Sequence, residues 1–413
     1  MADDITQDAI DAIAKHINER NNKNYSISVV TISGNYESPQ YFEIIPFMEI
    51  DNTNVGFYAV DGSYNSQPFY NGLAIGIYRA GYVSFRSGKQ VRMNSNNDPV
   101  ILGQSYTPKN ILVTQEEHKE AIYEELFTLL PVKNFLDFLE IKPNNLSGYQ
   151  KSAIFAGGMS TLLSFCQEIL EWSLVYEIAC RPEIQSGDFI LRDGSLRSLN
   201  IRQEHLVKLG KFLAQDKQLF LIGITKNSPI KMELNYTFRH IDNYLQDKLK
   251  HTYPFRTPNN HQRKLCCWFQ VSNPVLLSSY GDGSMFAKQA LRGGRGIGVF
   301  HVARLDYVEK LQNYDWVVAD LNIFNVIPLI EYEQLQRSST DLLTQVFEHL
   351  TRLTQEHYIL GYPYPLLEAH NFVTLKNDFK ELIINRVKQS MYESQGMDHV
   401  DIENLFVDIH TRF

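Results

Sequence analysis

The sequence predicts a mixed α/β fold, in which one β-sheet is flanked by helices. Short runs rich in β-branched and aromatic residues come early in the chain, and such runs later alternate with segments of helical periodicity. No internal repeat or low-complexity tract interrupts this order. Strands that come first and then alternate with helices are typical of a sheet whose faces are covered by helices.

The individual elements follow from periodicity and from turn signals. Strands are predicted at 25–33, 55–63, 70–85, 188–193, 218–228, 265–271, 297–305 and 316–321. Helices are predicted at 3–20, 114–131, 152–180, 202–215, 339–357 and 376–393. The Asn-rich stretch 89–110 is expected to form a surface excursion, and 144–150 is expected to break the helical region.

Size and charge restrict the class of protein. The 413 residues suffice for one large domain with insertions or for two domains. With 44% apolar and 21% charged residues, the composition is that of an ordinary globular protein. A net charge of −8 argues against a protein that coats DNA by bulk electrostatics, but an acidic metal site is compatible with it.

Targeting signals are absent from the sequence pattern. No apolar run reaches the roughly 18 residues that cross a bilayer. The acidic, amphipathic N-terminus lacks the basic start and apolar core of a signal peptide. The four cysteines include no pair with zinc-type spacing and no evident disulfide framework. We therefore expect a cytoplasmic protein with no membrane association.

Three Asp-Gly-Ser tripeptides are candidates for chemistry. Asp61 and Asp193 each end an apolar run that predicts a strand, whereas no strand run directly precedes Asp282, where we expect a plain turn. A carboxylate at the end of a buried strand is costly unless a cation lies beside it. The two strand-ending aspartates converge only if their strands are neighbours, and a divalent cation is the usual reason to tolerate converging carboxylates. Two independent turns are the alternative.

The longest predicted helix offers a third carboxylate. Its apolar stripe consists of Leu163, Cys166, Leu170 and Leu174. The next step of this stripe is Glu177, which we expect on the buried face near the negative end of the helix dipole. Glu168 and Glu171 fall on the polar face and are expected to be solvated. Glu177 then needs a partner, which is either a metal or, as the alternative, a salt bridge with Arg181 or Arg192.

Basic and imidazole side chains supply further candidates. Lys226 closes the predicted strand in "FLIGITKNS", where a lysine can bind a phosphate, although a solvated surface lysine is the alternative. In "GYPYPLLEAH", two prolines predict a rigid turn into a short helix that carries His370, either a metal ligand or proton-transfer group or a core histidine. Arg292 and Arg295 in "LRGGRGIG" could contact a DNA backbone, but an ordinary turn is favoured there.

Taken in order, these motifs resemble the NurA family of DNA-repair nucleases. The matching segments are "AVDGS", "VYEIA" ahead of "LRDGSL", "GITKNS" and "GYPYPLLEAH", and the resemblance covers about residues 55–375. It implies an RNase H-like core with an acidic two-metal site that usually holds manganese. It also implies 5′-to-3′ exonuclease and single-strand endonuclease activity on DNA. Family members form homodimers and work with HerA, a hexameric ATP-driven DNA translocase.

The resemblance also implies roles for individual residues. The residues that match the metal ligands are Asp61, Glu177 and Asp193. His370 would be a further ligand or a proton-transfer group, and Lys226 and Tyr362 would bind or position the phosphate. Tyr364 lies two residues from Tyr362 and could take its place.

The predicted domain organisation follows the extent of the resemblance. An N-terminal helix-and-strand extension spans 1–54, the nuclease domain spans 55–375, and a C-terminal helical segment spans 376–413. The chain is longer than compact members of the family, with insertions expected near 86–150 and 229–290. The predicted function is a metal-dependent DNA nuclease that uses Mn²⁺ or Mg²⁺, with two ions, and processes DNA ends beside a HerA-type hexameric ATPase.

Two other functions remain open at the level of the sequence. One is a nuclease-like docking subunit whose activity appears only in a complex with the translocase, in repair or in phage defence. The other is a phosphotransfer enzyme, because strand-Asp-Gly-Ser also resembles phosphate loops of sugar kinases and of phosphatases with an aspartyl nucleophile. Such phosphatases carry a second Asp where this chain has Ser63, and the second glycine-rich loop of the kinases is not found.

Overall fold

The computed structural model describes most of the segments that carry the motifs. The described residues are 15, 45–47, 54–69, 72–86, 89–90, 103–107, 112–113, 116–225, 266–270, 296–305, 316–326, 339–355, 362–375 and 377–407. Lys226, Asp282, Arg292 and Arg295 lie outside these ranges, as does the predicted strand at 25–33. The insertion predicted near 229–290 lies almost wholly outside them and stays a prediction.

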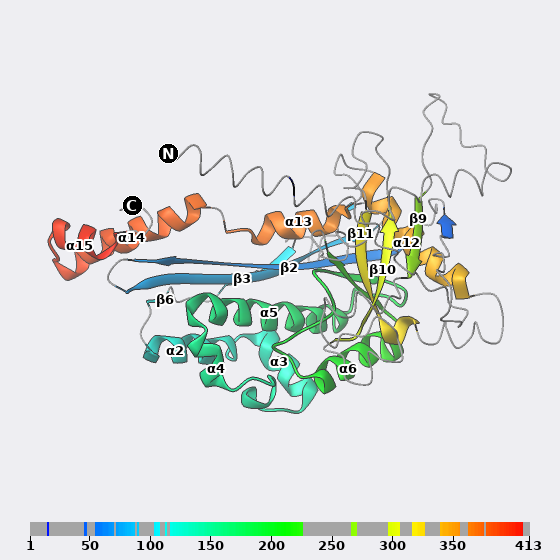
Figure 1. The fold of residues 1–413 in the computed structure, drawn as a ribbon, viewed down its shortest axis with the longest axis horizontal. Helices are drawn as coiled ribbons and strands as arrows, with labels where there is room; N and C mark the ends of the chain where they lie inside the picture. Colours follow the sequence, from blue (N-terminus) through cyan, green and yellow to red (C-terminus); the bar gives the residue numbers. More distant parts are fainter. Residues whose placement is uncertain are drawn as a thin grey trace, which may run out of the picture.

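The described strands form one mixed sheet with helices on both faces (Figure 1), which confirms the predicted α/β fold. The strands are β1 (Ile45–Phe47), β2 (Gly56–Pro68), β3 (Ala74–Arg86), β4 (Lys89–Gln90), β5 (Gly103–Tyr106), β6 (Leu112–Val113), β7 (Phe189–Asp193), β8 (Phe220–Thr225), β9 (Cys266–Gln270), β10 (Gly298–Arg304) and β11 (Trp316–Asn322). Their order is β1-β9-β10-β11-β8-β7-β2-β3-β4, with β5 and β6 also paired to β3. The pairs β2–β7 and β7–β8 are parallel, and the others are antiparallel.

The helices divide between the two faces of the sheet. They are α2 (Glu116–Leu126), α3 (Leu130–Leu139), α4 (Lys151–Ala156), α5 (Gly158–Ala179), α6 (Gln203–Lys211), α12 (Ser339–Gln355), α13 (Tyr364–Val373), α14 (Asn377–Gln395) and α15 (His399–Leu405), with a 3₁₀ turn η1 (Pro143–Asn145) and a π-helical turn η2 (Phe212–Asp216). One core packs α2 to α6 against the sheet, and the other packs α12 and α13 against the opposite face. None of the described helices is both long and apolar enough to cross a membrane.

Side-chain alternation along β2 decides which face each residue takes. Tyr58 and Val60 belong to the core beneath α5, whereas Phe57 and Ala59 belong to the core beneath α12 and α13. Because successive side chains of a strand point to opposite faces, Asp61 continues the series of Phe57 and Ala59 toward α13.

Strand β2 does not end at Asp61, and the predicted turn there is wrong. β2 pairs with β3 along its whole length, from Gly56 with Arg86 to Pro68 with Ala74. The chain reverses later, where Phe69 N donates to Leu73 O and Gly72 has φ +81°. The strand that stops at the level of Asp61 is its neighbour β7.

A glycine follows Asp61 because α5 lies very close to the ribbon of β2 and β3. A Cβ at Gly62 would lie 2.6 Å from both Gln167 Cγ and Glu171 Oε1. Gly62 thus leaves room for two side chains of α5, and its place in an Asp-Gly-Ser tripeptide does not mark a turn.

Other differences from the predicted elements are local. The helix predicted at 152–180 is divided into α4 and α5 at Gly158, which has φ +80°. The helix predicted at 114–131 ends early, and α3 follows it. The stretch 89–110, expected to be a surface excursion, contains β4 and β5, which pair with β3.

The C-terminal helices lie at the far end of the β2–β3 ribbon (Figure 1). The helix predicted at 376–393 is present as α14. The ring of Phe406, just after α15, meets that of Phe69 at the ribbon tip edge to face, with centroids 5.1 Å apart. Lys388 on α14 forms a 2.7 Å ion pair with Glu403 on α15. These contacts fix α14 and α15 to each other and to the tip of the ribbon.

Candidate metal centre

Two aspartates meet at the step in the sheet where β7 ends. Val60 of β2 is paired in parallel with Arg192 of β7, so the next residues, Asp61 and Asp193, lie side by side. Both side chains take the α13 face by alternation. After Asp193 the chain turns at Gly194, whose φ is +104° and whose N–H donates to Ile224 O. The Asp-Gly-Ser turn predicted at Asp193 is therefore present, and the two carboxylates converge.

Helix α13 brings an imidazole to the two carboxylates. His370 Nδ1 lies 2.9 Å from Asp61 Oδ2. One ligand atom from each of Asp61, Asp193 and His370 can be chosen so that all three lie within 4.8 Å of one another. The Asp61 side chain is 8% exposed and that of His370 is 46% exposed. The group therefore extends from the protein interior to the surface.

The electrostatics of Asp61 fit a bound cation. Burial raises the pKa of Asp61, the charge of Asp193 raises it further, and the hydrogen bonds with His370 and Gly62 N oppose the rise. The ionised pair is thus under strain in the absence of a positive charge. Two carboxylates and one imidazole are donors that suit divalent ions such as manganese. The described residues therefore fit a metal site.

A buried tyrosine completes the site. Tyr362 is 5% exposed, and its pKa is raised well above the ordinary value by burial and by the charges of Asp193 and Asp61. Tyr364 instead packs edge to face against Phe85, with centroids 5.4 Å apart. Of the two tyrosines left open by the sequence, Tyr362 is the one that lies beside the carboxylates.

Glu177 lies apart from this group. Its carboxylate accepts a 2.9 Å hydrogen bond from Arg181 Nη2 and bonds of 3.1 and 3.2 Å from the Tyr106 hydroxyl. The salt bridge with Arg181 is the alternative that the sequence left open. Glu177 is not among the three side chains whose ligand atoms gather, and Lys226 lies outside the described residues.

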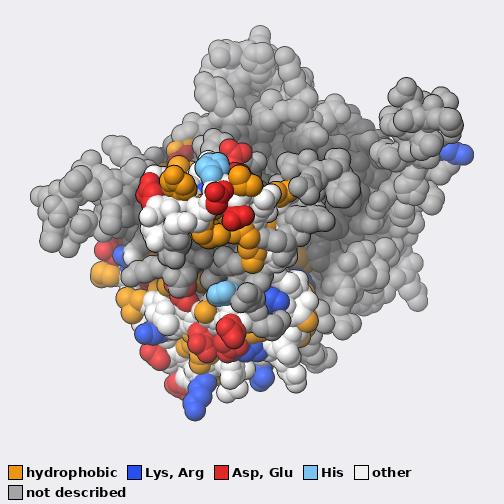
Figure 2. Space-filling view, turned by 90° about the vertical axis from the view of Figure 1, so that its left-hand side faces the viewer, with side chains coloured by type: hydrophobic (Ala, Val, Ile, Leu, Met, Phe, Trp, Pro, Cys, Tyr) orange, Lys and Arg blue, Asp and Glu red, His pale blue; other side chains and the backbone are white. Residues whose placement is uncertain are grey.

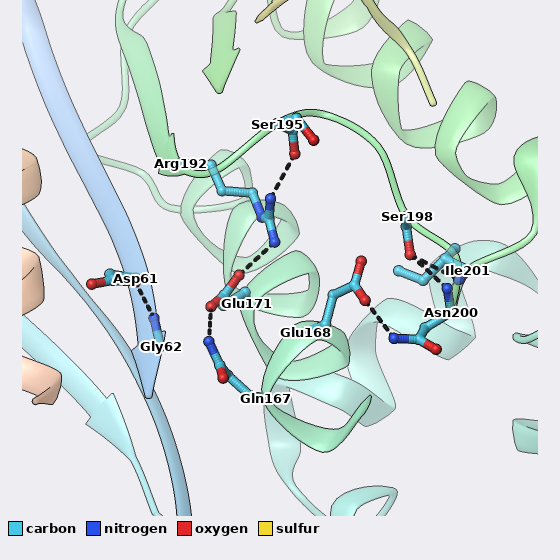
Figure 3. A network of polar contacts seen from close by, with 10 residues as sticks. All are labelled: Asp61, Gly62, Gln167, Glu168, Glu171, Arg192, Ser195, Ser198, Asn200 and Ile201. Atoms are coloured by element: carbon cyan, nitrogen blue, oxygen red, sulfur yellow. Dashed lines mark hydrogen bonds and ion pairs between the residues drawn. The ribbon is translucent and has the colours of Figure 1, made fainter. Parts of the chain in front are cut away.

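The carboxylate that is buried on α5 is Glu171, and its predicted solvated position is wrong. Glu171 is 3% exposed. Its Oε2 accepts a 2.6 Å bond from Arg192 Nη2, and its Oε1 accepts a 2.7 Å bond from Gln167 Nε2 (Figure 3). Burial raises the pKa of Glu171 to about 7, while Arg192 opposes the rise and Asp61 adds to it. Figure 3 shows this pair on the opposite side of β2 from the Asp61 side chain.

Arg192 connects this buried pair to the turn that follows Asp193. Its Nη1 donates a 2.6 Å hydrogen bond to Ser195 O, and its guanidinium lies 5.0 Å from the Trp172 ring centroid. On the other side of the turn, Leu196 N donates a 2.8 Å bond to Asp320 Oδ2. The backbone just beyond Asp193 is thus held from two directions, which fixes where its carboxylate points.

We expect Glu171→Gln to flatten the dependence of stability on pH between about 4.5 and 7. The pKa of Glu171 rises from 4.5 to about 7 on folding, so the native state binds more protons than the unfolded state in this window. The free energy of unfolding that this group contributes is complete below pH 4.5 and is lost as the pH rises to 7.

Urea denaturation at a series of pH values checks this expectation. Glu124→Gln, at an exposed position of α2, is the matched control and should keep the wild-type slope. The same slope for wild type and Glu171→Gln would contradict the assignment.

Comparison with known proteins gives similarity only among solved structures. No protein-family model matches the sequence, and no curated protein matches it. The chain is similar to the crystal structure of the NurA nuclease from Sulfolobus solfataricus, with a TM-score of 0.36 and 13% identity over 85% of this chain and 88% of that one.

Two further NurA structures are similar at the same level. For a crystal structure of NurA with manganese, the TM-score is 0.33 and the identity 13%, over 92% of this chain and 98% of that one. For NurA bound to dAMP and manganese, the TM-score is 0.30 and the identity 12%, over 97% and 96%. Similarity at this level does not assign a family to the chain.

Proposed function

We propose that this chain is a metal-dependent DNA nuclease. The observation that carries the proposal is the convergence of Asp61, Asp193 and His370 at the point where β7 ends. When bound there, a divalent ion such as Mn²⁺ or Mg²⁺ would stabilise negative charge on a phosphodiester and lower the pKa of water. Two ions, an RNase H-like arrangement of the sheet and action on DNA ends are the finer parts of the proposal, and they rest on the motif resemblance.

The chain's own residues have distinct roles in this proposal. Asp61 and Asp193 would hold the cation. His370 stands at the exposed rim, where an imidazole can ligate the ion or move a proton to or from the reacting oxygen. The Tyr362 hydroxyl lies close enough to Asp193 and Asp61 for their charges to raise its pKa, so it is placed to orient the Asp193 carboxylate. Lys226 is a further candidate for phosphate binding. Glu177 could act as a metal ligand only if its carboxylate gave up the ion pair with Arg181.

We expect the purified chain to degrade DNA with Mn²⁺ or Mg²⁺ and without ATP. End-labelled single- and double-stranded DNA and circular single-stranded DNA are incubated with each metal or with EDTA. Release from the 5′ end supports the predicted exonuclease polarity, and opening of the circle supports the endonuclease activity. Cleavage without ATP excludes the phosphotransfer alternative.

The absence of cleavage with every metal would contradict an autonomous nuclease. The same assay is then repeated with a HerA-type hexameric ATPase and ATP, because the motif resemblance implies that partner. The resemblance also implies that the chain forms a homodimer. Cleavage only in the complex would favour the docking-subunit alternative. Light scattering of the purified chain measures the number of copies, and a monomer would contradict the proposed homodimer.

A further inference from the structure

Arg79 lies on the same face of the ribbon as the candidate metal centre. Along the ribbon, Asp61 is paired with Gly81 and Ser63 with Arg79. Directly opposed residues share a face of a sheet, as do residues two apart on one strand. Arg79 and Asp61 therefore project toward α13, and their positions differ by about 7 Å along the strand direction.

The C-terminal end of α13 covers both positions. The Arg79 guanidinium carbon lies 5.3 Å from the ring centroid of Phe372, which follows His370 by two residues on α13. The Ser63 hydroxyl donates a 2.5 Å hydrogen bond to Val373 O. These two contacts hold the last turn of α13 against the β2–β3 ribbon. Because His370 lies on the same helix, its position relative to Arg79 is fixed.

The guanidinium of Arg79 retains donors that the described residues do not use. Its Nη2 donates a 2.8 Å bond to Ser105 Oγ, and its Nη1 has no hydrogen bond to a described residue, whereas its Nε is buried away from solvent. Among the described residues no carboxylate forms an ion pair with Arg79, and the pKa of Arg79 is lowered by burial. A half-buried arginine with unused donors is a ready site for an anion.

The charge of the rest of the molecule makes such a local cation important. The chain has a net charge of −8. Figure 2 looks onto the end where α14 and α15 lie, and acidic side chains stand out among the described residues there, with only scattered Lys and Arg. Non-specific attraction of DNA by the whole surface is therefore weak, and binding depends on individual contacts.

We propose that Arg79 binds the phosphate next to the one that is cleaved. The inference rests on the proposed nuclease function. The planar guanidinium matches a phosphate in a two-point hydrogen bond, and its offset along the ribbon is comparable with the step from one phosphate to the next in an extended single strand. Arg79 is thus a substrate-binding residue that sets the position of the DNA backbone relative to Asp61 and Asp193.

The test compares two substrates that differ in the neighbouring phosphate. Single-stranded DNA carries a phosphate next to the one that is cleaved, whereas bis(4-nitrophenyl) phosphate has a single phosphate and no neighbour. We expect Arg79→Met to lower kcat/KM for DNA at least tenfold more than for the small diester, mainly through KM. Arg79→Lys keeps the charge but not the planar fork, so its kcat/KM for DNA should lie between those of wild type and Arg79→Met. Arg202→Met, on the opposite face, is the matched control.

Salt dependence gives a second readout. We expect the slope of log affinity for single-stranded DNA against log salt to fall in magnitude by about 0.7 in Arg79→Met, the effect of one lost phosphate contact. Equal losses on both substrates, no loss on either, or an unchanged slope would overturn the proposal. If wild type hydrolyses neither substrate, the nuclease proposal fails by itself, and the slope, measured by fluorescence anisotropy without metal, still decides the role of Arg79.

Discussion

We expect the Asp61→Asn variant to lose metal-dependent DNA cleavage by about a thousandfold or more while remaining folded. The substitution removes one of the two charges that we propose hold the cation, and a bound ion contributes several kcal/mol of charge stabilisation in the transition state. The carboxamide keeps an oxygen that can accept the 2.7 Å bond from Gly62 N, so the local backbone has no reason to move. Cleavage rates with saturating Mn²⁺ measure the loss.

Stability is expected to be equal to that of wild type or slightly higher. Burial and Asp193 both raise the pKa of Asp61, which means that the ionised carboxylate is unfavourable in the metal-free fold. Neutralising it removes that penalty. Asp137→Asn, at an exposed position of α3, is the matched control. Isothermal titration should give two Mn²⁺ ions for wild type and weaker binding for Asp61→Asn, and full activity in the variant would refute the metal centre.

Arg192→Met should lower the free energy of unfolding by about 3–5 kcal/mol, because it leaves Glu171 buried without its partner. The side chains of Arg192 and Glu171 are 9% and 3% exposed, so water cannot replace the lost ion pair. Arg202→Met removes a more exposed pair, Arg202 with Glu204 at 3.8 Å, together with a 3.1 Å hydrogen bond from Arg202 Nε to Ser147 O, and should cost no more than about 2 kcal/mol. A loss for Arg192→Met as small as that of the control would contradict the buried pair.

The double variant Glu171→Met/Arg192→Met separates packing from positioning. Replacing a buried ion pair by apolar side chains of similar size is often neutral, so most of the stability should return. Cleavage should stay about 10–100-fold below wild type, because the bond from Arg192 to Ser195 O no longer holds the turn after Asp193. Recovery of both properties would mean that the pair only fills the core.

Asp193 illustrates what the sequence can predict about this site. The apolar run before it predicts a buried strand, and Gly194 supplies the positive φ that a turn requires. The same tripeptide at Asp61 gave a wrong turn, because Gly62 is needed for the approach of α5 and not for backbone conformation. Local sequence does not distinguish these two uses of glycine, since the second depends on a helix about 100 residues away.

The sequence predicts Glu177 as the buried glutamate of α5, whereas the structure buries Glu171, and the cause is related. An apolar stripe marks the buried side of a helix only when its other side faces water. Helix α5 is packed between the sheet and α3, and residues on nearly all of its sides are buried, Trp172 and Ser173 included. The periodicity therefore could not tell which glutamate lies inside. Glu171 is buried because it pairs with Arg192, 21 residues further along the chain, and the sequence carries no signature of this pairing.

The three gathered side chains also set an order of assembly. Asp61 and His370 are 309 residues apart, and Val60 and Arg192, whose pairing aligns the two aspartates, are separated by more than a hundred. Such distant contacts make folding slow, and domains fold as their sequences emerge, at about 5–20 residues per second during synthesis. A nascent chain exposes both aspartates well before α13 leaves the ribosome. The proposed metal centre is completed only when that helix docks, so a translation product that ends before α13 lacks one of its three side chains.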